Sequence, residues 1–88
     1  MEKNENQINI ELSEEVAGGI YSNLAIITHS QAEFVCDFVQ MLPGMPKAQV
    51  KSRIVMTPQN AKRLMRALIE NVQKYEHAMG TINDQDMP

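Results

Sequence analysis

The stretch SRIVMTPQNAKRLMRALIENVQKYEHAMG, residues 52–80, joins the end of a predicted strand to one long predicted helix. Thr57 is a favourable N-cap residue, and Pro58 follows at the first helical position, where its missing N–H leaves no hydrogen bond unmade. Gly80 stands where a left-handed cap is needed at a helix C-terminus. The stretch therefore predicts a helix from Pro58 to about Met79.

This predicted helix is amphipathic. At about 100° per residue, its apolar side chains fall on one continuous face and most of its charged side chains on the other. The apolar face comprises Ala61, Leu64, Met65, Leu68, Ile69, Val72, Tyr75 and Met79. Such a face must be covered, and we expect a sheet formed by the preceding residues to cover it.

Four upstream segments have the character of strands. Residues 8–12, 34–41 and 48–56 alternate apolar and polar side chains with the period of a half-buried strand. Residues 20–28 carry apolar side chains on both faces, so that each face needs a cover. The sequence thus predicts an α+β fold, β-β-β-β-α, with an antiparallel sheet of three to four strands and one long C-terminal helix packed on one face. The first strand either pairs within its own protomer or reaches a neighbouring one.

The chain is predicted to form a single domain. We expect a disordered tail at residues 1–7, one α+β domain at residues 8–80 and a flexible tail at residues 81–88. Residues 13–19 are expected to form a connection, and residues 30–33 a tight turn or a single helical turn between two strands of a hairpin.

An 88-residue chain holds only a small core. Burial at about 25 cal/mol per Å² nearly cancels a conformational entropy of about 1.5 kcal/mol per ordered residue at this size. The single cysteine, Cys36, excludes an internal disulfide, and no His/Cys cluster suggests a structural zinc. We therefore expect a homo-oligomer, most simply a dimer. Candidate contacts are the outer strand residues Tyr21 and Ile27 and the small helix residues Ala67, Asn71 and Ala78.

Charge is segregated along the chain. Residues 1–40 hold seven acids and one base, whereas residues 41–66 hold six bases and no acid. Lys62, Arg63 and Arg66 occupy the first turns of the predicted helix, where acids are normally favoured, so they are a candidate anion site. The alternatives are an acidic partner from the same chain or another subunit, a phosphate-bearing ligand or nucleic acid, and simple solvation. A sequence pI of about 5.2 and the lack of an aromatic platform make nucleic acid the less favoured partner.

No constellation of catalytic residues is apparent. His29 and Ser30 are adjacent but lack a third orienting group, and His77 lies on the polar face of the helix. Cys36 shares one face of its predicted strand with Phe34 and Phe38 and is expected to be a small buried core residue. Asp37 points the other way and is expected either to be solvated or to pair with Lys51 or Arg53 on a neighbouring strand. We therefore expect no enzyme activity, no cofactor and no metal site. With no signal-like start and no long apolar run, we also expect no membrane partner and a cytoplasmic location.

The most specific segments of the chain resemble a small bacterial and phage family known as a domain of unknown function. The resemblance covers about residues 20–82 and is strongest at residues 52–58, Ala61-Lys62, Leu68, Asn71, Tyr75-Glu76 and Gly80. It implies a shared fold and assigns no activity or functional residues. The order of elements is also similar to that of the export chaperone SecB, which runs four antiparallel strands into a long helix.

The expected function is that of a non-catalytic interaction or scaffold module. A chaperone-like surface for unfolded chains, as the SecB-like element order suggests, is the first alternative. Binding of anions or nucleic acid through the basic segment at residues 47–66 is the second.

Overall fold

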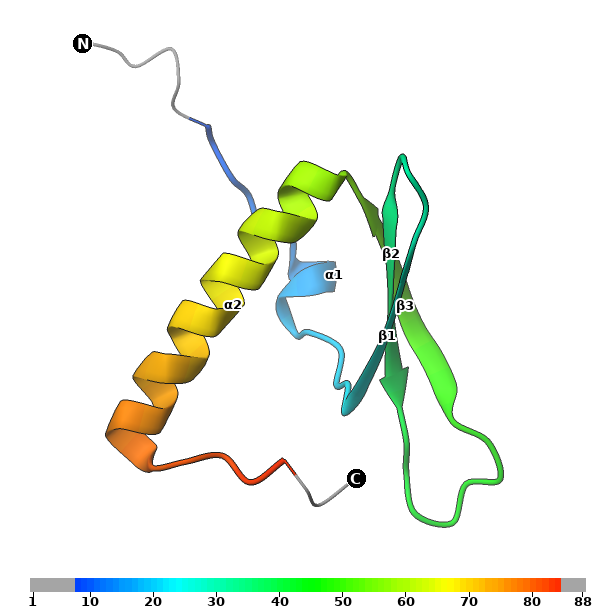
Figure 1. Ribbon diagram of the computed structural model, residues 1–88. Helices are drawn as coiled ribbons and strands as arrows, with labels where there is room; N and C mark the ends of the chain where they lie inside the picture. The colour runs from blue at the N-terminus through cyan, green and yellow to red at the C-terminus, as the bar shows by residue number, and fades with distance from the viewer. Residues whose placement is uncertain (1–7, 85–88) are drawn as a thin grey trace, which may run out of the picture.

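The computed structural model describes residues 8–84 and confirms the predicted α+β class. A three-stranded antiparallel sheet is followed by one long helix (Figure 1). In chain order the elements are α1 (Glu14–Ala17), β1 (Leu24–His29), β2 (Phe34–Gln40), β3 (Gln49–Met56) and α2 (Pro58–Met79). The sheet order is β1-β2-β3, so β2 is central and the other two strands form the edges.

The strand register places the predicted core residues on one face. Ile27 pairs with Cys36, and Cys36 pairs with Ile54 on the next strand, so these three side chains share a face of the sheet. Phe34 pairs with Met56 on that same face, because residues two apart in a strand point the same way. The face of β2 that carries Phe34 and Cys36 is therefore the one that looks toward α2.

Two local hydrogen-bond systems fix the β1–β2 hairpin. At its turn, the Ser30 hydroxyl accepts from the Glu33 backbone N–H at 3.3 Å, and the Ser30 N–H donates to the Glu33 carbonyl at 2.9 Å. At the other end, Asn23 donates through Nδ2 to the Met41 carbonyl at 2.9 Å, and its Oδ1 accepts from the Met41 N–H at 2.8 Å. The predicted tight turn at residues 30–33 is confirmed. The predicted strand at residues 20–28 begins only at Leu24, because Asn23 uses its side chain to hold the strand end.

The ends of α2 follow the sequence prediction. Thr57 Oγ1 accepts from the Asn60 N–H at 3.1 Å, and Pro58 occupies the first turn. Gly80 ends the helix with a φ of 99°, a positive value that favours glycine, but its ψ of 169° differs from that of the predicted left-handed cap. Its N–H donates to the Glu76 carbonyl at 2.9 Å. The Glu76 carboxylate also accepts from the Ile82 N–H at 2.9 Å, so the chain beyond the helix folds back on its last turn.

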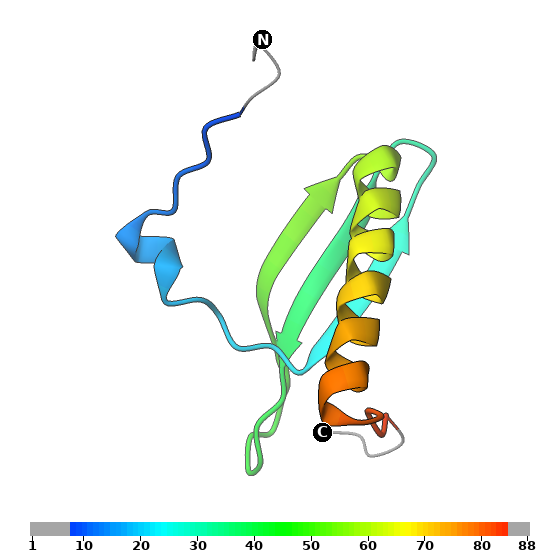
Figure 2. The same cartoon turned by 90° about the vertical axis from the view of Figure 1, so that its left-hand side faces the viewer.

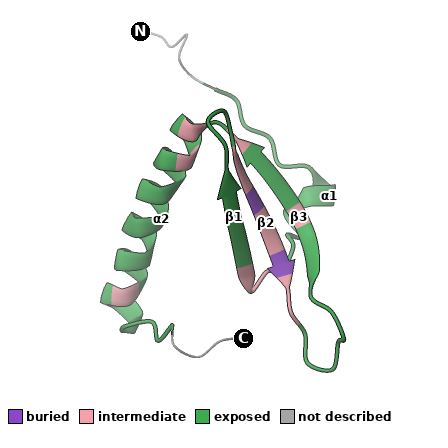
Figure 3. Ribbon diagram, turned by 45° about the vertical axis from the view of Figure 1, so that its right-hand side comes forward, coloured by how far each residue is buried: buried purple, intermediate pink, exposed green. Residues whose placement is uncertain are grey.

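The helix faces the sheet but does not close onto it. From the end of β3, α2 diverges from the sheet toward its own C-terminus (Figure 1), and the turned view shows it running across the face of the strands (Figure 2). No residue of α2 is buried. Within residues 8–84, the buried apolar residues are Cys36 and Val39, both on β2 (Figure 3). A groove therefore replaces the closed core that was expected between helix and sheet.

The first of the four predicted strands, at residues 8–12, is not part of the sheet. This segment runs away from the body of the protein (Figures 1 and 2), and Ile8, Ile10 and Leu12 are exposed by 80%, 88% and 70%. A strand needs a partner for its backbone hydrogen bonds, and the segment does not approach either edge of its own sheet. Of the two arrangements that the sequence left open, pairing within the same protomer is therefore not observed for residues 8–12, and the sheet has three strands, the lower of the two predicted numbers.

The connection predicted at residues 13–19 contains a short helix. The Ser13 side chain accepts from the Val16 N–H at 3.3 Å, and Glu14 and Glu15 occupy the first turn of α1. A serine cap followed by two acids is a typical helix start, and this signal was available in the sequence. The predicted tails at residues 1–7 and 85–88 lie outside the described residues.

Candidate functional site

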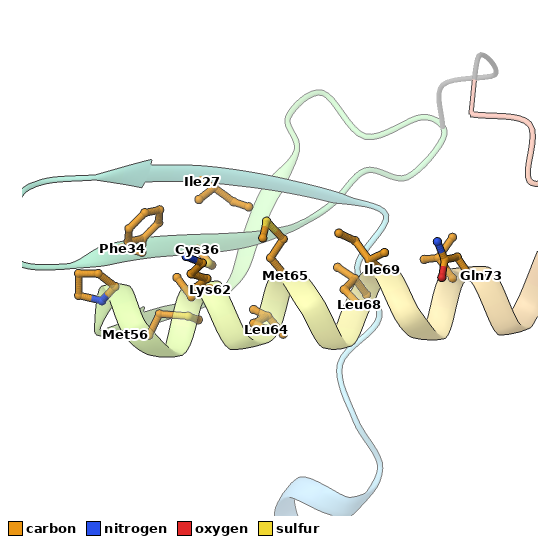
Figure 4. Close-up of a pocket in the computed structure, with 13 residues that line it drawn as sticks. Ile27, Phe34, Cys36, Met56, Lys62, Leu64, Met65, Leu68, Ile69 and Gln73 are labelled. Atoms are coloured by element: carbon orange, nitrogen blue, oxygen red, sulfur yellow. The ribbon is translucent and has the colours of Figure 1, made fainter.

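The groove between α2 and the sheet is the main concave feature of the described chain. Its volume is about 750 Å³. The sheet contributes Ile27, Phe34, Cys36 and Met56, and the helix contributes Pro58, Ala61, Lys62, Leu64, Met65, Leu68, Ile69, Val72 and Gln73. Figure 4 shows Met65 and Ile69 rising from α2 toward the strand that carries Ile27.

The groove has the composition of a protein core. Lys62 and Gln73 are its only lining residues with a strongly polar side chain. Leu68 is 59% exposed, although it belongs to the helix face that the sequence pattern assigns to the interior. Ile27, predicted on the outer face of the sheet, lies instead on the groove face, because it pairs with Cys36, and it is 60% exposed. Isolated exposed apolar residues are ordinary in proteins, but a continuous apolar patch of this kind marks an interaction surface.

The total surface of the chain supports the same conclusion. Its accessible area is 8018 Å², whereas a compact monomer of 9.9 kDa exposes about 5,200 Å². Part of this difference belongs to residues 8–12, which run away from the sheet (Figures 1 and 2). A standard interface removes about 800 Å² from each partner. The uncovered area is therefore ample for a stable interface.

The predicted oligomer contacts fall into two groups. Ile27 lines the groove, whereas Tyr21 is exposed outside it. Ala67, Asn71 and Ala78 are exposed on a part of α2 that does not line the groove. Asn71 Nδ2 donates to the Ala67 carbonyl one turn earlier at 2.8 Å, so this amide is engaged within its own helix. The structure thus brings Ile27 together with the apolar helix face and leaves the other four apart.

The predicted anion-binding residues lie on adjacent turns of α2. Lys62 lines the groove, while Arg63 and Arg66 are exposed outside it. Within residues 8–84, no ion pair links any of the three to an acidic side chain. The N–H of Asn60 at the start of the helix already donates to Thr57. Among residues 8–84 the three cations have no acidic partner, so an acidic group of another subunit, an anionic ligand and simple solvation remain the alternatives.

Glu76 is one of the two acidic residues of α2, with Glu70, and the sequence analysis did not consider it as a candidate for the site. It is half-buried, unlike the exposed Lys62. On a helical projection it falls on the same flank of the apolar face as Lys62 and Ile69, since these residues are spaced by seven, or about two helical turns. A helical projection of the sequence is enough to place Glu76 on this flank.

The opposite face of the sheet carries a bidentate ion pair. Arg53 Nε donates to Asp37 Oδ1 at 2.6 Å, and Arg53 Nη2 donates to Asp37 Oδ2 at 2.9 Å. These residues are cross-strand partners on β2 and β3, as one of the sequence alternatives for Asp37 anticipated. The hydrogen bond from the Arg53 guanidinium holds the pKa of Asp37 below its ordinary value. The pair stabilises the sheet and does not face the groove.

The remaining candidates for chemistry do not assemble into a site. The ring of His29 stacks on Phe34 with centroids 5.3 Å apart, and Cys36 is buried with a free thiol. Among residues 8–84, no group of three or more His, Cys, Asp or Glu side chains is arranged to hold a metal ion. Neither helix of that range has the length and hydropathy needed to span a bilayer.

Comparison with known proteins identifies a family and no characterised relative. Neither the curated proteins nor the solved structures include a match to this chain. One family model matches residues 1–84, nearly the whole sequence, and this agrees with the resemblance seen in the most specific segments. The chain therefore belongs to the family described as protein of unknown function DUF3467.

Proposed function

We propose that the protein is a non-catalytic interaction module that assembles with a second copy of itself through the groove. The observation that carries this proposal is the uncovered apolar face of α2, which lines a groove of about 750 Å³ and has no buried residue. A monomer that buries so little apolar surface is too weakly stabilised to fold by itself and needs a partner that is always present. A second copy is always available at the same concentration, and closed homodimers are the commonest assemblies.

The charge pattern of α2 favours an antiparallel pair of helices. A two-fold axis that crosses the helices near Ile69 brings Lys62 of one copy opposite Glu76 of the other, because each lies seven residues from Ile69. The same arrangement sets the basic first half of one helix beside the half that contains Glu70 in the other. The apolar residues between these pairs then fill both grooves, and Lys62 gains an acidic partner.

Two neighbouring substitutions test which face of α2 is used. Leu68→Glu places a charge in the groove, whereas Ala67→Glu places the same charge on the small flank outside it. We expect light scattering coupled to size exclusion to give the dimer mass for the wild type and for Ala67→Glu. Leu68→Glu should shift the dimer to monomer or to unfolded chain, because a charge buried in an apolar interface lacks a partner. The reverse pattern would assign the interface to the flank of Ala67, Asn71 and Ala78.

The groove also gives the chaperone-like alternative a definite test. Met56 and Met65 line it, and flexible thioethers suit surfaces that accept varied apolar partners. If the wild-type protein is a folded monomer that suppresses aggregation of an unfolded client, and Leu68→Glu abolishes the suppression, the groove binds other chains and the dimer proposal fails.

A further inference from the structure

Residues 8–12 have the pattern of a strand without a partner. Ile8, Ile10 and Leu12 point to one side of an extended chain, and Asn9 and Glu11 point to the other. All five residues are exposed, and the segment runs away from the sheet of its own chain (Figures 1 and 2). An extended segment with three large apolar side chains on one side is suited to joining the edge of a sheet.

The sheet offers two such edges, β1 and β3. Each edge strand presents a row of backbone N–H and C=O groups that its single neighbour does not use. β3 spans eight residues, enough to pair with a strand of five. β1 is shorter, with six residues and no acidic or basic side chain other than His29. The two edges therefore differ in both length and charge.

The side chains of β3 match those of the segment on both faces. Ile54 and Met56 lie on the groove face, while Arg53 lies on the opposite face with Asp37. A strand that adds to β3 with its three apolar residues on the groove face necessarily turns Glu11 toward the face of Arg53. At the β1 edge, Glu11 would instead lie on the face of Ile26 and Thr28, which carry no positive charge. The charge of Glu11 and the greater length of the edge therefore select β3.

We propose that residues 8–12 of one copy add as a fourth strand to the β3 edge of a second copy. This inference rests on the proposed self-assembly and names the elements that exchange. The segment is led away from its own sheet by α1 and by the clamp of Asn23 on Met41, so that another copy is within its reach. The exchanged Ile8, Ile10 and Leu12 extend the apolar wall of the groove beyond β3. Reciprocal exchange makes each subunit a four-stranded sheet.

A mixed-label nuclear magnetic resonance experiment tests the exchange. A spin label is attached to Asn9→Cys in a Cys36→Ala background, and this chain is mixed with unlabelled, ¹⁵N-enriched Cys36→Ala protein until subunits exchange. Only contacts between copies then broaden the observed signals. We expect the strongest broadening at β3 amides and weaker broadening at β1 amides. The matched control carries the spin label at Lys74→Cys, on the polar face of α2, and should not select the β3 edge.

The other possible results contradict the choice of edge, the strand exchange or the self-assembly. Strongest broadening at β1 contradicts the choice of edge. Broadening that appears only when label and isotope share one chain contradicts exchange between copies. No broadening in a mixed sample that sediments as a dimer overturns the strand exchange and leaves the proposed self-assembly standing, whereas a monomeric sample overturns both. As a second measurement, backbone hydrogen exchange of residues 8–12 should be at least about tenfold slower in the wild type than in Leu68→Glu.

Discussion

Asp37 and Arg53 form the best-defined polar contact of the sheet. The side chain of Asp37 is 14% exposed, whereas that of Arg53 is 65% exposed, so solvent screens one end of the pair far more than the other. The bidentate geometry nevertheless ties β2 to β3 at the centre of the sheet. Because the pair lies on the face opposite the groove, its removal tests the sheet without altering the residues that line the groove.

The lowered pKa of Asp37 predicts a specific pH dependence. A carboxyl with a depressed pKa in the folded state contributes stability above its ordinary value of 3.8 and loses that contribution as pH falls through the folded pKa. Asp37→Asn should therefore unfold at a lower temperature than the wild type at about pH 7, and the difference should shrink below about pH 4. Thermal unfolding followed by circular dichroism measures it, with Glu33→Gln as the control for removing an acid. A difference that stays constant with pH would contradict the ion pair.

Side-chain direction was the most predictable property at this scale. The parity of Phe34, Cys36 and Phe38, the burial of Cys36 and a cross-strand partner for Asp37 all follow from the two-residue period of a strand, which neighbouring residues fix. The side-chain clamp of Asn23 on Met41 was not predictable, because it joins residues 18 positions apart. Long-range polar contacts of this kind have no local pattern.

The start of α2 is an element whose stability can be measured separately from the interface. Thr57→Ala removes the acceptor for the Asn60 N–H and should lower the free energy of unfolding by about 1 kcal/mol. Thr57→Ser keeps the hydroxyl and should retain most of that stability. Urea unfolding at one fixed protein concentration measures both, since assembly makes stability concentration-dependent. Equal losses for alanine and serine would show that the methyl group, and not the cap, matters.

The antiparallel helix pair is tested by exchanging its charges. Lys62→Glu and Glu76→Lys should each weaken the dimer, because each places two like charges opposite one another. The double variant restores opposite charges and should recover much of the lost affinity, by several-fold in the dissociation constant. Analytical ultracentrifugation of the four proteins gives the coupling between the two sites. Additive losses in the double variant would contradict the register centred on Ile69.

Sequence patterns predicted the existence of elements better than their partners. The cap, proline and glycine of α2 lie within or beside the helix, so its bounds were confirmed from Pro58 to Met79. The segment at residues 8–12 has an equally clear strand pattern, yet a strand forms only where a partner edge is available. The sequence alone does not say in which copy that edge lies.

At the scale of the whole molecule, two surfaces have no partner within residues 8–84. The groove leaves α2 uncovered, and the free edge of β3 leaves the sheet without its fourth strand. The sequence predicted that an 88-residue chain needs a partner, because its core is too small for its conformational entropy. It could not indicate the groove, which depends on the angle at which α2 leaves the sheet. A dimer in which each copy contributes α2 and residues 8–12 to the other would cover both surfaces.

Sedimentation equilibrium of the wild-type protein tests self-assembly most directly. At protein concentrations of about 1 to 50 µM, we expect a mass of about twice 9.9 kDa, with dissociation only toward the lower concentrations. The melting temperature should rise with protein concentration over the same range, since folding and association are coupled. A single species of 9.9 kDa that unfolds cooperatively at a high, concentration-independent temperature would contradict the account.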